Sequence, residues 1–313
     1  MHILRAKNGD YDTTTPSALD FLMGKIKKDS YSDKDIHKVL ISKESFIFIK
    51  QLANFWINPY DYFSETSKKY FDILSKYQNE YWKIPVSMCI WEFRNKDSVN
   101  ELEIDEKVFD ELFPKLITFI TIALINGKGT TSSLKGVLYK ANVEIHKNKK
   151  IIFQHNFENL IFEDFLKFCL KTQAKNIRYL LVLYTYLFDL DQKREWDWED
   201  NKSKIKRTCV LDSEIEHILP KAWQNANFNG WNEEIQKKYL EQIGNKMLLE
   251  KPLNIKCGDD FFANKKITYR KSGFKEAQKI SREDKKIYWL KEDIEARNEE
   301  IYERLKAFFE KNL

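Results

Sequence analysis

The chain has 313 residues, of which 42% are hydrophobic and 14% aromatic, and this much apolar material excludes a globally disordered protein. Its 53 basic and 48 acidic residues give a net charge of +5, which is compatible with a local phosphate-attracting surface but does not establish nucleic-acid binding. Because domains commonly hold about 100–200 residues, two domains or one elongated domain are expected. Nine glycines and six prolines are few, which favours helices over turn-rich β architecture.

The cysteines and the apolar stretches bear on the cellular compartment. No two cysteines form a CxxC pair, which argues against a Cys₄ zinc site and predicts reduced thiols of a cytosolic protein. Residues 1–7 lack the apolar run of a signal peptide. The longest apolar stretch, Leu116 to Ile125, is too short to cross a membrane and is predicted to be a buried helix. A cytoplasmic protein without a membrane partner is therefore expected.

The first 190 residues are predicted to form a helical domain. Residues 1–15 are polar and expected to fray, and Pro16 after three threonines predicts the start of a helix. Apolar residues then recur at helical spacing in three segments, residues 46–56, 71–82 and 108–120. The glycine-containing segment 126–130 predicts a break between helices.

A short basic run, residues 146–150, lies in the next part of the chain. It has two interpretations, an exposed loop or helix end and a phosphate contact. Apolar residues from Phe162 to Leu170 predict another helix. The segment from Asn176 to Leu190 is so apolar that it is predicted to be the most buried helix of the protein.

The character of the sequence changes after residue 190. Residues 192–206 are charged and are interpreted as a connection between parts of the protein. Residues 208–211 predict a short strand that leads into Glu216 and His217, and Pro220 ends it.

The remaining segments complete a second predicted domain, from residue 191 to residue 313. A helix is expected over 233–242, a second strand over 246–249, and Asn254 is expected to open a loop before a helix through 261–269. The last stretch, 284–313, predicts a closing helix. Strand, loop, strand and helix in this order are the ββα-metal arrangement, so the predicted fold class is mainly α, of α+β type.

Glu216, His217 and Asn254 are the candidate chemical groups of this domain. A carboxylate and an amide supply the oxygen ligands that Mg²⁺ prefers, and Mg²⁺ keeps several waters, so two protein ligands suffice. A histidine with an ordinary pKa of about 6.5 is mostly neutral at neutral pH and can take a proton from water. The set predicts a metal-dependent phosphodiesterase site.

The strength of this prediction lies in four ordered motifs. They are Glu216-His217-x-x-Pro220, Gly244-Asn245-x-x-Leu248-Leu249, Leu253-Asn254, and Phe262-x-x-Lys265-Lys266-x-x-Tyr269-x-x-Ser272. The set resembles the C-terminal HNH-type nuclease domain of GmrSD-type proteins, which are modification-dependent restriction enzymes and related phage-defence nucleases. It is also similar to the HNH domain of the RNA-guided CRISPR nuclease. The motifs cover about residues 208–272, and Trp289 to Arg297 is similar to the closing helix of the family.

The resemblance implies a role for each matching residue. His217 matches the general base that activates water, and Glu216 matches the carboxylate metal ligand. Asn254 matches the final metal-binding asparagine, whereas Asn245 matches the middle asparagine that holds the loop and orients the histidine. Lys265 matches a helix lysine that is a candidate for phosphate contact or charge stabilisation. The implied cofactor is Mg²⁺, with Mn²⁺ or another divalent metal as alternatives, and the implied partner is DNA.

Each of these residues also has a structural interpretation that the sequence leaves open. His217 could be a histidine of the core, Asn245 a turn residue and Asn254 a helix N-cap. Lys265 and its neighbour Lys266 could form a solvated helix face.

The chain departs from the family pattern in two respects. Many HNH sites have aspartate where this chain has Glu216, which leaves ligation possible but changes its geometry. Full-length family members carry a preceding sulfiredoxin-like or ParB-like domain that reads DNA modification or hydrolyses nucleotide, and no equivalent is found before residue 190. The chain is therefore expected to be a fragment, a separate subunit or a stand-alone nuclease, with a modification-sensing or NTPase domain or subunit as an expected partner.

Two hypotheses follow. The first is a metal-dependent HNH endonuclease that hydrolyses DNA, in restriction of modified or foreign phage DNA. The second is a catalytically silent nucleic-acid-binding or assembly subunit of a defence complex, in which the helical half is the functional surface.

Overall fold

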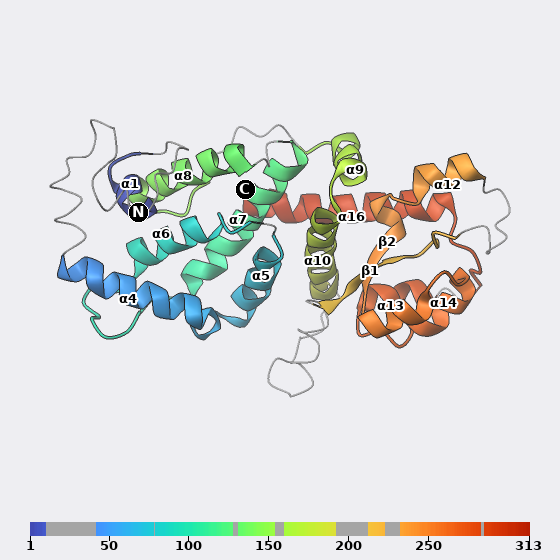
Figure 1. Ribbon diagram of the computed structural model, residues 1–313, viewed down its shortest axis with the longest axis horizontal. Coiled ribbons are helices and arrows are strands. Elements are labelled where there is room, and N and C mark those ends of the chain that lie inside the picture. The colour runs from blue at the N-terminus through green and yellow to red at the C-terminus, as the bar shows by residue number, and fades with distance from the viewer. Residues whose placement is uncertain are drawn as a thin grey trace. The chain divides into compact units, whose positions relative to one another are not determined.

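The protein is described by a computed structural model that covers residues 1–10, 42–77, 79–127, 131–153, 160–191, 212–222, 232–282 and 285–313 (Figure 1). Its residues cluster in two compact units. Unit 1 comprises Met1–Leu74, Asn79–Glu158 and Asn312–Leu313, and unit 2 comprises Ser75–Gln78 and Asn159–Lys311. The predicted division into functional domains of 1–190 and 191–313 stays a prediction, because compactness does not delimit a functional domain.

The regular elements of unit 1 are all helices among its described residues. Its helices are α1 (His2–Lys7), α4 (Lys43–Ile57), the 3₁₀ helix η1 (Pro59–Tyr62), α5 (Glu65–Ser75), α6 (Lys83–Phe93), α7 (Lys107–Ile125) and α8 (Thr131–Asn148). Helix α7 is apolar on nearly all sides and is buried along most of its length, as such a composition requires. The predicted helical segments 46–56 and 108–120 lie in α4 and α7, whereas the predicted segment 71–82 is interrupted, because α5 ends at Ser75 and α6 begins at Lys83. The chain turns at residues 126 and 127 after α7, as predicted, and residues 128–130 lie outside the described residues. The predicted helix start at Pro16 lies outside the described residues.

The core of unit 1 is a cluster of aromatic rings. The ring centroid of Phe63 lies 4.9 Å from those of Phe71 and Phe109 and 5.1 Å from that of Phe113. All four side chains are buried. Aromatic pairs at these separations add attraction beyond the area they bury, so this cluster joins η1, α5 and α7.

Two further expectations for unit 1 were wrong. Residues 2–7, within the stretch 1–15 that was expected to fray, form α1, whose Arg5 pairs with Asp10 at 2.9 Å, and residues 11–15 lie outside the described residues. Helix α4 forms as predicted, but it buries Phe48 and Phe55, whereas Phe46 of the predicted apolar face is 67% exposed. Apolar residues occupy more than one side of α4, so their spacing predicts the helix without selecting the buried face.

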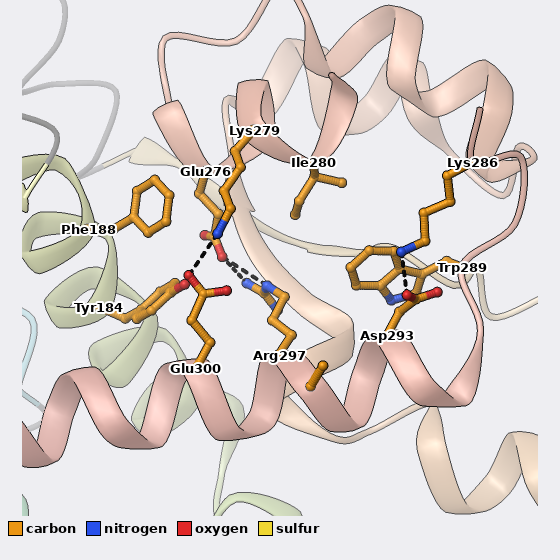
Figure 2. Close-up of a pocket in the computed structure, with 11 residues that line it drawn as sticks. Tyr184, Phe188, Glu276, Lys279, Ile280, Lys286, Trp289, Asp293, Arg297 and Glu300 are labelled. Atoms are coloured by element: carbon orange, nitrogen blue, oxygen red, sulfur yellow. Dashed lines mark hydrogen bonds and ion pairs between the residues drawn. The ribbon is translucent and has the colours of Figure 1, made fainter. Parts of the chain in front are cut away.

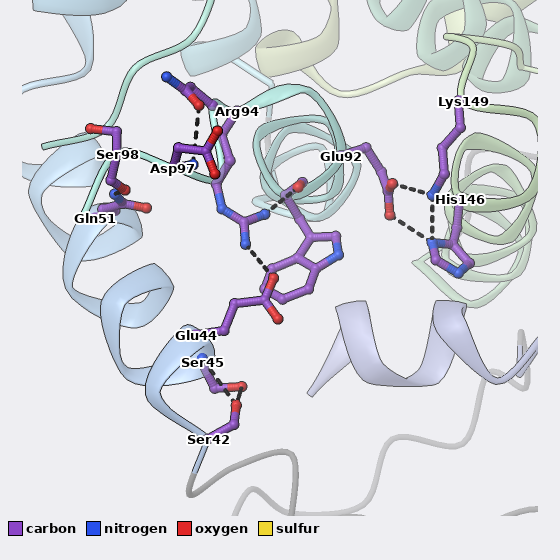
Figure 3. Close-up of polar contacts among 12 residues, drawn as sticks. Ser42, Glu44, Ser45, Gln51, Glu92, Arg94, Asp97, Ser98, His146 and Lys149 are labelled. Carbon is purple, nitrogen blue, oxygen red and sulfur yellow. Dashed lines mark hydrogen bonds and ion pairs between the residues drawn. The ribbon is translucent and has the colours of Figure 1, made fainter.

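Polar contacts of unit 1 tie loops and helix ends together, as Figure 3 shows. Glu44 on α4 pairs with Arg94, which follows α6, at 3.0 Å. Glu92 pairs with His146 Nδ1 at 2.6 Å and also contacts Lys149. The basic run 146–150 thus begins in the last turn of α8 and contacts an internal carboxylate, in line with its interpretation as a helix end.

Unit 2 combines helices with one small sheet. Its elements are α9 (Phe162–Lys171), α10 (Ala174–Asp191), β1 (Glu214–His217), α12 (Glu233–Tyr239), the 3₁₀ helix η3 (Ile243–Asn245), β2 (Lys246–Leu249), α13 (Lys251–Cys257), α14 (Phe262–Tyr269), α15 (Lys275–Ser281) and α16 (Lys291–Asn312). Strands β1 and β2 pair antiparallel, with Glu216 opposite Met247 and His217 opposite Lys246. A mainly helical fold with a small sheet, of α+β type, is confirmed.

Packing around this sheet fixes its two sides. Helix α13 packs against β1, while α10 and α15 pack against β2 (Figure 1). All four residues of β2 are buried, and α10 is buried from Asn176 to Phe188 except at Arg178. The buried character predicted for α10 is thus found. None of the described helices is long and apolar enough to cross a membrane.

Three boundaries in unit 2 differ from expectation. The residues that were predicted to form the first strand, 208–211, and the connection 192–206 lie outside the described residues, and β1 contains Glu216 and His217 themselves. Asn254 does not open a loop, because it lies inside α13. The closing helix begins at Lys291 and not at residue 284. Its start is fixed by Asp293, whose carboxylate accepts the Leu290 N–H at 2.8 Å as a cap.

Candidate active site

Strand β1 presents the two central candidates on opposite faces, since successive side chains of a strand alternate. Glu216 points inward and is 3% exposed. The next side chain, His217, is half-buried, with 18% of its side chain exposed. The imidazole of His217 is therefore less enclosed than the carboxylate of Glu216.

Helix α14 holds the Glu216 carboxylate. Lys265 and Tyr269 lie one turn apart on the same face of α14, and both donate to Glu216 Oε1 at 2.8 Å. The Lys265 ammonium also donates to the backbone carbonyl of His217 at 2.7 Å. Burial raises the pKa of Glu216, although the Lys265 charge and the two hydrogen bonds oppose the rise. Lys265 is itself only 1% exposed, so its ammonium is engaged inside the protein.

His217 is kept neutral by its surroundings. Burial is the main cause that lowers the pKa of His217 to about 4, and the charges of Lys246, Lys221 and Lys265 act in the same direction. Glu241 opposes them, but its carboxylate lies 3.7 Å from His217 Nε2, beyond a hydrogen bond. Among the described residues Nε2 has no hydrogen-bond partner. Nε2 is itself buried, and in the tautomer with the proton on Nδ1 it can accept a proton from a water molecule that reaches it.

Asn245 closes the loop that follows His217. Its Oδ1 accepts the Leu219 N–H at 2.7 Å, and its Nδ2 donates to the carbonyls of Leu219 at 3.2 Å and Leu240 at 3.0 Å. Its own carbonyl accepts the Ile218 N–H at 2.9 Å. The side chain is fully buried and satisfied by backbone groups, which suits a structural hold on the loop. A catalytic role for Asn245 stays a prediction.

Helix α16 fixes the turn that carries Asn245. Asn298 Oδ1 accepts the Gly244 N–H at 2.7 Å, and Arg297 Nη1 donates to the carbonyls of Ile243 at 3.1 Å and Gly244 at 2.8 Å. A Cβ at position 244 would lie 2.1 Å from the carbonyl oxygen of Ile294, so only glycine fits there. The Gly-Asn pair signalled a turn in the sequence, but nothing in the sequence pointed to Asn298.

Arg297 is anchored on its other side by Glu276 of α15, as Figure 2 shows. Arg297 Nε donates to Glu276 Oε1 at 2.9 Å, and Nη2 contacts the same oxygen. Both side chains are buried. A cavity of about 240 Å³ lies beside this pair. The three cations drawn there are matched by carboxylates, in the pairs Arg297–Glu276, Lys279–Glu300 and Lys286–Asp293. Such a lining does not suit a phosphate group.

Asn254 lies in the middle of α13, the helix that packs on β1. Its side chain is half-buried. The N-cap of α13 is Glu250, so Asn254 is not the cap of this helix. A role as metal ligand stays a prediction for this residue.

Glu216 is the candidate carboxylate ligand of this site, and α14 sets the orientation of its carboxylate. Both donors from α14 reach Glu216 Oε1, and neither reaches Oε2. One carboxylate oxygen with the amide oxygen of Asn254 is a set that Mg²⁺ accepts, because it retains waters. The charge of Asp259, directly after α13, also acts on Glu216 and raises its pKa. No group of three or more His, Cys, Asp or Glu side chains suited to a metal is found within the described ranges.

Comparison with known proteins identifies one family. The family model of the C-terminal domain of GmrSD restriction endonucleases matches residues 146–304, just over half of the chain. This range contains β1, β2, α13, α14 and most of α16, and so every candidate residue of the site. No curated protein matches the chain.

Proposed function

Because the chain belongs to the family of GmrSD restriction endonucleases, whose C-terminal domain it contains, we propose that it is a metal-dependent HNH endonuclease that hydrolyses DNA phosphodiester bonds. The family implies a restriction nuclease. The observation that supports the finer proposal is the neutral His217, whose Nε2 has no hydrogen-bond partner among the described residues and which directly follows the buried Glu216 in β1.

His217 is the proposed general base. With its pKa at about 4, the imidazole is in its neutral form at neutral pH, and in the tautomer with the proton on Nδ1 its Nε2 can take a proton from the attacking water. Lys265 donates to the His217 carbonyl, and the Asn245 side chain binds both the N–H and the carbonyl of Leu219. These contacts hold the backbone at the end of the strand, which supports a fixed position from which the His217 ring projects.

Glu216 and Asn254 are the proposed metal ligands. When bound, Mg²⁺ or Mn²⁺ would stabilise negative charge on the phosphate and on the leaving oxygen. Glu216 supports this assignment because its carboxylate is held from one side through Oε1. Asn254 supports it because its helix packs on the strand that carries Glu216.

The biological context belongs to the same proposal. The family implies a DNA substrate, and we extend this to restriction of modified or foreign phage DNA in the cytoplasm. A modification-sensing or NTPase domain or subunit is the proposed partner.

The test is plasmid cleavage by the parent protein and by His217→Ala, with and without Mg²⁺ or Mn²⁺. Cleavage should require metal and should fall at least about 100-fold in the variant, since a general base contributes this much or more. His146→Ala is the matched control and should cut as the parent does, because His146 contacts Glu92 in unit 1. Unmodified, hydroxymethylated, glucosylated and phosphorothioate plasmids should be compared.

Two outcomes contradict the proposal. A folded His217→Ala protein that cuts as fast as the parent would remove His217 from the base role. A parent that binds DNA equally with and without metal, and cuts none of the four plasmids, would favour the catalytically silent alternative.

A further inference from the structure

Helix α14 brings two buried donors to a single oxygen atom. Lys265 Nζ and Tyr269 Oη both lie 2.8 Å from Glu216 Oε1, and they lie one helical turn apart. Lys265 and Tyr269 are almost completely buried. A lysine at this depth does not face a DNA backbone, so its two internal bonds are the guide to its role.

The direction of these bonds is informative. A carboxylate has two oxygens, and both donors reach Oε1, which leaves Oε2 without a donor among the described residues and able to bind a further partner. Carboxylates that bind metals are themselves usually hydrogen-bonded by outer residues, which fix their orientation. Tyr269 suits such a role because its hydroxyl is its one polar side-chain group and it points at Glu216.

Lys265 has a second contact that Tyr269 lacks. Its ammonium donates at once to Glu216 Oε1 and to the His217 carbonyl at 2.7 Å. One cation therefore links the side chain of the proposed metal ligand to the backbone of the proposed base. A change at Lys265 should disturb both groups, and a change at Tyr269 only the carboxylate.

We propose that Lys265 and Tyr269 are positioning residues that hold Glu216 by Oε1 and present Oε2 to the metal ion, with Lys265 also fixing the His217 backbone. This inference rests on the proposed function, because it presupposes a metal at Glu216. It assigns Lys265 to the interior of the site in place of the predicted phosphate contact, and it adds Tyr269.

The first test is Mn²⁺ binding to the DNA-free full chain, followed by electron paramagnetic resonance. Tyr269→Phe should raise the Mn²⁺ dissociation constant about 10-fold or more, as loss of an outer hydrogen bond to a ligand does. Tyr302→Phe is the matched control, because it removes a tyrosine hydrogen bond to the Leu160 carbonyl at 2.6 Å elsewhere in unit 2. It should leave the dissociation constant unchanged. Circular dichroism of the metal-free proteins reports whether each variant is folded.

The second test separates the two residues by the metal dependence of cleavage. Tyr269→Phe should need more Mg²⁺ for half-maximal cleavage and recover most of the parent rate at saturating metal. Lys265→Met should stay slow at saturating metal, because it also releases the His217 backbone. A merely structural role for Tyr269 would lower thermal stability without changing the Mg²⁺ requirement of the folded protein.

The outcomes distinguish this inference from the proposed function. If Glu216→Gln abolishes Mn²⁺ binding while Tyr269→Phe binds as the parent does, the positioning role is overturned and the metal site stands. If the parent binds no Mn²⁺, the metal assignment and the positioning role fail together. If Tyr269→Phe does not fold, Lys265→Met decides, and a Mn²⁺ affinity and saturating rate equal to those of the parent would overturn the inference.

Discussion

The ion pair Glu44–Arg94 of unit 1 and two ion pairs of unit 2 differ in how far their carboxylates are buried, although unit 1 also holds the nearly buried pair Arg5–Asp10. In unit 1 the interior is a cluster of phenylalanine rings, and the carboxylate that pairs with Arg94, Glu44, is 56% exposed. In unit 2, by contrast, the pairs Glu216–Lys265 and Glu276–Arg297 are buried on both sides. Buried ion pairs are weak evidence of stabilisation, because apolar residues of similar volume often serve a fold equally well. In unit 2 these two buried pairs fix the orientation of their side chains. One of the two, Glu216–Lys265, lies in the candidate site.

The largest effect should come from unpairing a buried charge. Glu276→Gln leaves the Arg297 guanidinium buried without a counter-charge, and the free energy of unfolding should fall by about 3–5 kcal/mol. Glu111→Gln is the comparison in unit 1 and should cost less than about 1 kcal/mol, since the carboxylate of Glu111 and the ammonium of its partner Lys115 are both partly exposed to solvent. Urea denaturation of both variants measures the difference. Equal losses would show that the two units do not differ in this way.

The next effect concerns pH. In the unfolded chain His217 has its ordinary pKa of about 6.5, whereas burial lowers its pKa in the folded protein to about 4. Below pH 6.5 the unfolded chain therefore binds a proton that the folded chain does not. The free energy of unfolding is therefore unaffected by the titration of His217 above about pH 6.5. It falls by about 3 kcal/mol in total as the pH is lowered from 6.5 to 4, because the unfolded state alone gains the proton.

The variant His217→Asn isolates this contribution. His2 in unit 1 also has a pKa of about 4, so the parent loses stability from both histidines over the same range. The unfolding free energy of the parent should fall relative to that of the variant as the pH is lowered from 6.5 to 4. Urea denaturation of both proteins at several pH values can follow this change. A constant difference would mean that His217 is not held neutral by burial.

The smallest predicted effect is steric. Gly244→Ala places a Cβ 2.1 Å from the Ile294 carbonyl oxygen, so the turn or α16 must shift, at a cost of about 1–3 kcal/mol. Because the turn carries Asn245, cleavage should also fall. Gly127→Ala in unit 1 is the control, since its Cβ meets nothing within 4 Å although the residue has φ +68°. Denaturation and plasmid cleavage test both, and cleavage by Gly127→Ala should equal that of the parent.

Much of the fold could be predicted because local patterns determine it. The spacing of apolar residues predicted most helices, and Lys246 to Leu249 form β2 as expected. The local sequence pattern does not predict an element whose structure depends on residues that are distant in the chain. Strand β1 has the sequence Glu-Ile-Glu-His, which is unremarkable as a strand and is stabilised by β2 and by α14. In α4, local spacing could not choose between two apolar faces.

The candidate site was predictable in its residues and less so in its contacts. The ordered motifs brought Glu216, His217 and Asn245 together, and they lie on β1 and on the turn directly before β2. A lysine on a helix is normally solvated, so the burial of Lys265 could not be inferred from α14 alone. It depends on a carboxylate 49 residues earlier in the chain. Asn254 was matched by its motif, but its position inside α13 was missed.

The hold of α16 on the turn before Asn245 limits how this site can be transplanted. A graft of residues 214–269 onto another scaffold would carry the residues for the chemistry but would omit Arg297 and Asn298. The Gly244 N–H and the carbonyls at 243 and 244 would then lose their partners. A designer who wants this site must therefore include α16 as well, because its contacts give the turn before Asn245 its conformation.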